Sequence, residues 1–161
     1  MRRVSYVFLA TVLLAALTGC GGADRSKAVD LIALAADLTG SGVYSDILNP
    51  PFEDAEVVAT LYDLAPTDVT TGIVRCSTGA TAEELALFQA ADEDAAARIE
   101  MAMQTRVQRQ IAAFARYVPE EVPKLEQALV QRSGVYVALV VAAQSDGADK
   151  ILYNYFYATR V

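Results

Sequence analysis

The chain has 161 residues, of which 13 are basic and 20 acidic, so its formal net charge is −7 at pH 7. An acidic surface is repelled by phosphate backbones, which argues against nucleic-acid binding. The chain has no histidine, and this excludes the Ser-His-Asp and Cys-His nucleophile systems and most zinc sites.

The first twenty residues carry the most specific motif of the sequence. Two arginines precede an apolar run from Val4 to Leu17, and the sequence Leu17-Thr18-Gly19-Cys20 closes it. A basic start, a short apolar run and small residues before a cysteine are typical of an exported lipoprotein's signal. The run is shorter than the roughly 20 residues that a membrane-spanning helix needs. We therefore expect residues 1–19 to be a removable signal peptide and Cys20 to carry the lipid on the outer face of the cell membrane.

Small and polar residues follow the cysteine, so residues 20–26 are predicted to be a lipidated tether and residues 27–161 a single domain. At the start of that domain, apolar residues at helical spacing predict a helix that ends at Gly40. Its expected apolar positions are Ala28, Leu31, Ile32, Ala35 and Leu38, with Ser26 as a possible N-cap. A second, short helix fits Asp54 to Asp63, since Pro66 disfavours its continuation.

A hairpin is expected next. Val69 to Cys76 is rich in β-branched residues and predicts a strand, and Ser77-Thr78-Gly79 turns the chain. Glu84 to Ala90 predicts the returning strand, because an acidic helix start follows it directly.

The clearest pattern runs from Glu93 to Tyr117, where apolar residues recur every three or four positions and predict the main core helix. Its apolar stripe comprises Ala96, Ile99, Met103, Val107, Ile111 and Phe114. Asp92, Glu93 and Asp94 suit the positive end of the helix dipole, so we do not interpret them as a metal site.

The last third of the chain predicts a second hairpin and a final helix. Pro119 to Pro123 is interpreted as a stiff acidic connector. Strands are expected at Ala128 to Arg132 and at Val135 to Ala142, joined around Ser133-Gly134, and a helix at Ala148 to Tyr157. Hairpin strands pair antiparallel, so the predicted class is α+β: an antiparallel sheet of about four strands, covered by one long helix and a C-terminal helix, with a helical N-terminal segment.

No metal, cofactor or disulfide is expected. With Cys20 lipidated, Cys76 has no partner within the chain, so we interpret it as a small, buried apolar side chain.

Three segments together resemble a known family. They are Ser77 to Glu84, Phe88 with the helix start at Asp92 to Ala96, and Pro119 to Glu126. Across about residues 57–145 they resemble a family of bacterial lipoproteins described only as a domain of unknown function. The resemblance implies an exported, lipid-anchored protein of the kind found in Gram-positive, Clostridia-like bacteria, and it implies no catalytic residues.

The candidate binding residues lie in two of those segments. Gly79, Thr81, Glu83 and Glu84 could form a small ligand loop, although such a segment is more often a plain hairpin turn. Glu120 and Glu121 could face a basic partner, although a solvated connector is the commoner structure.

Two functions remain open on this sequence. The first is a non-catalytic binding or accessory lipoprotein, held at the membrane by its lipid, that contacts an envelope protein or wall component. The second is a carboxylate-dependent hydrolase of cell-wall glycan, which needs two acids about 5 to 9.5 Å apart across a cleft. We favour the first, because adjacent Glu83 and Glu84 are expected on opposite faces of one strand.

Overall fold

The computed structural model describes residues 28–52 and 54–158. The predicted signal peptide and the whole predicted tether, residues 20–26 with Cys20 and Ser26, lie outside these residues.

A four-stranded antiparallel sheet forms the centre of the domain, with the strand order β1-β2-β4-β3. Two hairpins build it, so the predicted α+β class is confirmed. The strands are β1 (Val69–Cys76), β2 (Glu84–Ala90), β3 (Leu129–Ser133) and β4 (Tyr136–Val141). Gly79 and Gly134 lie in the two turns with φ of 97° and 55°, a region that favours glycine.

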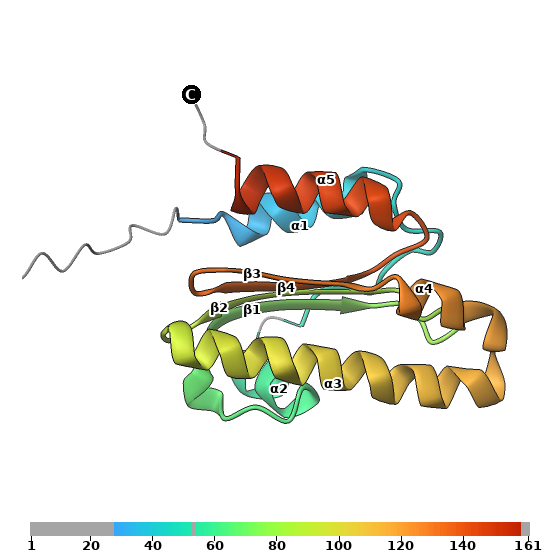
Figure 1. Ribbon diagram of the computed structural model, residues 1–161, viewed down its shortest axis with the longest axis horizontal. Helices are drawn as coiled ribbons and strands as arrows, with labels where there is room; N and C mark the ends of the chain where they lie inside the picture. Colours follow the sequence, from blue (N-terminus) through green and yellow to red (C-terminus); the bar gives the residue numbers. More distant parts are fainter. Residues whose placement is uncertain (1–27, 53, 159–161) are drawn as a thin grey trace, which may run out of the picture.

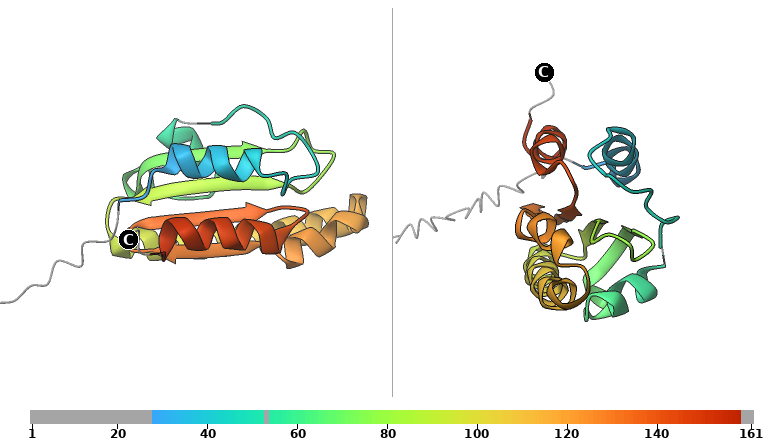
Figure 2. Two further views of the ribbon diagram at one scale, coloured as in Figure 1. Left: turned by 90° about the horizontal axis from the view of Figure 1, so that it is seen from above. Right: turned by 90° about the vertical axis from the view of Figure 1, so that its right-hand side faces the viewer.

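Helices cover both faces of the sheet (Figures 1 and 2). On one face lie α1 (Leu31–Gly40) and α5 (Ser145–Phe156), and on the other lie α2 (Ala55–Leu61) and α3 (Glu93–Tyr117). The two central strands are apolar at almost every position because both of their faces are buried. In β2, Leu85 and Leu87 pack towards α1 and α5, whereas Ala86 and Phe88 pack towards α3.

The long helix α3 has the predicted bounds and the predicted stripe. Ile99, Met103 and Val107 are buried against the sheet, and Ile111 and Phe114 are partly buried against the same core. Asp92 is the N-cap, and its carboxylate accepts from the Ala95 N–H at 2.7 Å. The dipole interpretation of this acidic helix start is therefore consistent with its geometry.

Two helix starts differ from the predictions by more than two residues. α1 begins at Leu31, because Asp30 caps it by accepting from the N–H groups of Ile32 and Ala33. Ile32 is 76% exposed, so its predicted place on the apolar face is wrong. α5 begins at Ser145, three residues before the predicted start.

The segment predicted as a stiff connector is helical. Pro119–Glu121 forms the 3₁₀ turn η2, and Val122–Glu126 forms the short helix α4. A second 3₁₀ turn, η1 (Pro66–Asp68), leads into β1.

Candidate functional site

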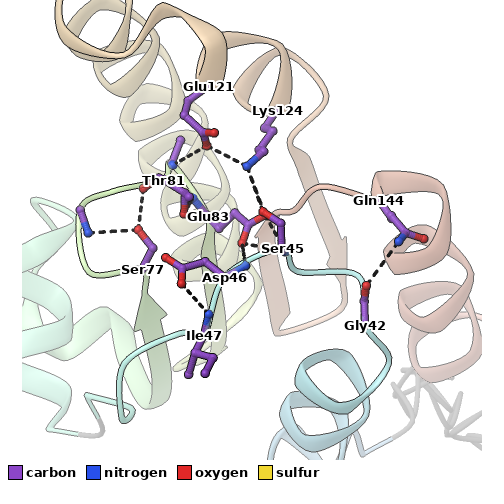
Figure 3. A network of polar contacts seen from close by, with 12 residues as sticks. Gly42, Ser45, Asp46, Ile47, Ser77, Thr81, Glu83, Glu121, Lys124 and Gln144 are labelled. Atoms are coloured by element: carbon purple, nitrogen blue, oxygen red, sulfur yellow. Dashed lines mark hydrogen bonds and ion pairs between the residues drawn. The ribbon is translucent and has the colours of Figure 1, made fainter.

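The two segments that hold the candidate binding residues meet at one end of the sheet (Figure 3). The Ala82 N–H, after the β1–β2 turn, donates to Oε2 of Glu121 in η2 at 2.9 Å. Lys124 in α4 extends this contact, since its Nζ lies 2.9 Å from Glu121 Oε2 and 3.4 Å from Glu83 Oε1. The β1–β2 turn and the α3–α4 connection thus form one structural unit.

Glu83 is buried and bound on the side of the sheet that faces α1. Its carboxylate accepts from the Ser45 N–H at 2.9 Å, from the Ser45 hydroxyl at 2.7 Å and from the Asp46 N–H at 2.9 Å (Figure 3). Burial raises the pKa of Glu83, but these hydrogen bonds and the Lys124 charge outweigh it, so the net pKa is below its ordinary value. The side chain is therefore an ionised, fully occupied anchor for the loop that follows α1.

Glu84 points to the opposite face, towards α3, as the alternation along a strand predicts. It accepts from Arg106 Nε at 2.7 Å, Arg106 Nη2 at 2.9 Å and Gln110 Nε2 at 2.8 Å. The Tyr62 hydroxyl also donates to it, and the Arg106 guanidinium lies 4.9 Å from the centre of the Tyr62 ring. Burial and the Glu84 charge raise the pKa of Tyr62, which keeps the phenol a donor.

Three of the six candidate binding residues are interior. Glu83, Glu84 and Glu121 expose only 1%, 2% and 8% of their surface. The expectation that Glu121 faces a partner is therefore wrong: η2 turns its carboxylate inward, onto the Ala82 N–H and Lys124. Gly79 and Glu120 are exposed and Thr81 is half-buried, so these three remain available at the surface.

A hollow opens beside the buried carboxylates, between the β1–β2 turn and α3. Its inner part has a volume of about 210 Å³ and is lined by Gly79, Thr81, Glu83, Glu84, Cys76, Ser77, Ala82, Arg106, Gln110 and Phe114. Its outer part, of about 260 Å³, shares Gly79 and Phe114 and adds Tyr117, which is largely exposed. We call these two parts together the turn hollow. Four of the predicted residues line it.

Larger depressions lie along α3 but hold none of the candidate binding residues. One of about 520 Å³ lies between α2 and α3 and shares Arg106 and Gln110 with the turn hollow. Another of about 960 Å³ runs between α3 and β3.

Cys76 lines the turn hollow and is only partly buried, rather than fully buried as the sequence suggested. Burial raises the pKa of its thiol to about 11. The thiol is therefore protonated at neutral pH, which makes it a weak nucleophile.

Residues 28–52 and 54–158 contain neither a membrane-spanning helix nor a cluster of metal ligands. In that part of the chain, no helix combines the length and the apolarity needed to cross a bilayer. No group of three or more histidine, cysteine, aspartate or glutamate side chains there is arranged to hold a metal ion.

The sequence interpretation missed Ser45, Lys124, Arg106 and Gln110 as partners of the two glutamates. A signal for the Glu84 partners was present. A glutamate that opens an apolar strand needs a buried cation, and Arg106 and Gln110 are four residues apart on one helix face.

The bound state of Glu83 predicts a pH dependence of stability. Because its folded-state pKa is lowered, its contribution is complete above the unfolded pKa and is lost as the pH falls through the folded value. The free energy of unfolding should therefore fall in urea titrations from about pH 6 to about pH 3. Glu83→Gln should flatten this dependence, and the exposed control Glu120→Gln should leave it unchanged. Equal slopes in all three proteins would contradict the predicted role of Glu83.

Comparison with known proteins identifies the family but no characterised relative. The family described as "Domain of unknown function (DUF4358)" matches residues 48–142, which is more than half of the chain. No curated protein and no solved structure matches significantly. The matched region contains the whole sheet and all six candidate binding residues, and it leaves out α1 and α5. The chain therefore belongs to the DUF4358 family of domains of unknown function.

Proposed function

We propose that this protein is an exported lipoprotein, anchored through Cys20 to the outer face of the cell membrane, whose domain binds an envelope protein or wall component without catalysis. The anchoring part rests on the sequence Leu17-Thr18-Gly19-Cys20 after a short apolar run. We propose the turn hollow as the binding site of the domain.

One observation carries the binding part: the carboxylates at the site are already occupied by the protein's own groups. A general acid or base must reach its substrate by a hydrogen bond. Glu83 is held by Ser45, Asp46 and Lys124, and Glu84 by Arg106, Gln110 and Tyr62, on opposite sides of the sheet. Carboxylates held in this way stabilise the surface around them but are not free to bond to a substrate. This favours a binding function over the glycan hydrolase.

The rim of the turn hollow has the composition of a recognition surface. Tyr117 presents a largely exposed ring beside Phe114, and the exposed Gly79 lets a partner approach the backbone closely. Aromatic rings supply contact area and a polar tip at little conformational cost, which is why they are enriched at interfaces.

The anchoring part predicts the behaviour of Cys20→Ser. Without the sulfur no thioether to diacylglycerol can form, and stable anchoring by acyl chains is lost. In cells fed a labelled fatty acid such as palmitate, the wild type should carry the label and fractionate with membranes. Cys20→Ser should carry none and should be unprocessed or released. Label that persists in the variant would contradict the anchoring site.

The binding part is tested by pull-down from detergent-solubilised envelopes with purified wild type, Tyr117→Ser and Tyr153→Ser. Tyr153 is the matched control, an exposed helical tyrosine that does not line the turn hollow. We expect Tyr117→Ser to lose a partner that the other two proteins retain. If instead the purified protein releases reducing ends from wall glycan, the hydrolase is the correct function.

A further inference from the structure

The helices α1 and α5 run antiparallel, which defines two ends of the domain. The Gln144 N–H donates to the Val43 carbonyl at 3.0 Å, so the start of α5 lies beside the end of α1. The end of α5 therefore lies beside the start of α1, close to Ala28, where the described part of the chain begins (Figure 1). We call this the tether end.

The turn hollow lies at the other end. Ser45, in the loop that follows α1, is bonded to Glu83, and Ile47 lies in the same loop (Figure 3). β1 and α3 both run from the tether end towards the hollow, and α3 alone is about 37 Å long at 1.5 Å per residue over its 25 residues.

Exposed apolar side chains occur at the tether end. Ile32, in the first turn of α1, is 76% exposed, and Tyr153, near the end of α5, is 57% exposed. Tyr157 is also exposed; its ring centre lies 5.8 Å from that of Tyr153, and its hydroxyl donates to the Arg132 carbonyl at 2.9 Å. Amphipathic aromatic rings are enriched at membrane interfaces, and an exposed aliphatic side chain at the same end of the domain adds apolar surface.

The chain between Cys20 and the domain is short, so it limits how far the tether end can lie from the membrane. Whatever their conformation, the residues from Cys20 to Ala28 span at most about 30 Å. A tether of that reach keeps the domain close to the bilayer but does not by itself orient it. The start of α3, on the other layer of the sheet, carries three carboxylates, Asp92 to Asp94, whereas the first turn of α1 carries only its N-cap Asp30. The α1/α5 layer is therefore repelled less by anionic lipids.

We propose that the domain rests on the bilayer through Ile32, Tyr153 and Tyr157, with these side chains in the lipid headgroup region and the turn hollow directed away from the membrane. This inference rests on the proposed lipid anchor at Cys20. It makes the lipid surface a second, non-covalent partner of the domain and leaves the binding site free for partners in the envelope.

The test uses the full lipidated protein, purified from membranes and reconstituted into phosphatidylcholine vesicles. The chain has no tryptophan, so Tyr153→Trp reports on the tether end alone. Ile47→Trp is the control, since Ile47 is 86% exposed in the loop beside Glu83. In vesicles with brominated acyl chains, Tyr153→Trp should lose most of its emission and shift to shorter wavelength, and Ile47→Trp should do neither. Ile32→Trp serves as a second reporter should Tyr153→Trp not fold.

The outcomes separate the orientation from the anchor. If the protein floats with the vesicles but the tether-end reporter is unquenched, or both ends are quenched alike, the orientation is overturned and the anchor stands. If the protein carries no lipid and does not float, the anchor fails and the orientation with it.

Discussion

Replacing Arg106 with methionine should lower the free energy of unfolding by about 3 to 5 kcal/mol, because it leaves Glu84 as a buried charge without its cation. The guanidinium donates twice to the carboxylate and also covers the Tyr62 ring. Methionine keeps much of the side-chain volume, so the loss reports the charge rather than a cavity. Urea unfolding followed by circular dichroism, on the chain without signal and lipid, measures it.

Arg109→Met provides the matched control on the same helix. Arg109 pairs with Asp63, but both side chains are largely exposed, so the loss should stay within about 1 kcal/mol. Equal losses in the two variants would show that Glu84 does not depend on Arg106, and the buried network would then not be the framework of the site.

Replacing Ile99 with alanine should lower the free energy of unfolding by about 2 to 5 kcal/mol. Ile99 is fully buried in the core between α3 and the sheet, so the substitution removes apolar contacts and leaves a cavity. Met101→Ala, two residues away on the exposed side of α3, should change the value by less than about 0.5 kcal/mol. A small loss at Ile99 would mean that α3 does not cover the sheet as described.

Local patterns in the sequence were sufficient to predict the bounds of the elements with the clearest patterns. β1, β2 and α3 have the predicted bounds because their β-branched content or apolar stripe coincides with the burial in the fold. The start of α5 was missed because Gly147 favours a turn. In the fold Gly147 lies inside α5, where a side chain would come within 3.1 Å of Val43, so close packing explains the glycine.

The site could be predicted only in part. Strand alternation was enough to place Glu83 and Glu84 on opposite faces, but it could not identify what holds them. Ser45 is 38 residues before Glu83, and Lys124 comes from a segment that the sequence suggested to be a solvated connector. Such contacts depend on how layers stack, and no local pattern encodes them. The burial of Glu121 was missed for the same reason.

This burial also changes which substitutions test function. Changes at Glu83, Glu84 or Glu121 alter the internal framework, so they affect stability along with any binding. Tyr117 and Glu120 lie at the surface and can be replaced without breaking a buried contact. We therefore expect variants at the surface positions to separate binding from folding.

Binding at the turn hollow is tested most directly by photocrosslinking in intact cells from position 117, with a photoreactive phenylalanine analogue in place of Tyr117. The same analogue in place of Tyr153 is the control at the tether end. We expect one discrete crosslinked product, to an envelope protein or wall fragment, from position 117 and none of that product from position 153. No product from position 117 in a folded, membrane-bound protein, or the same product from both positions, would contradict binding at the turn hollow.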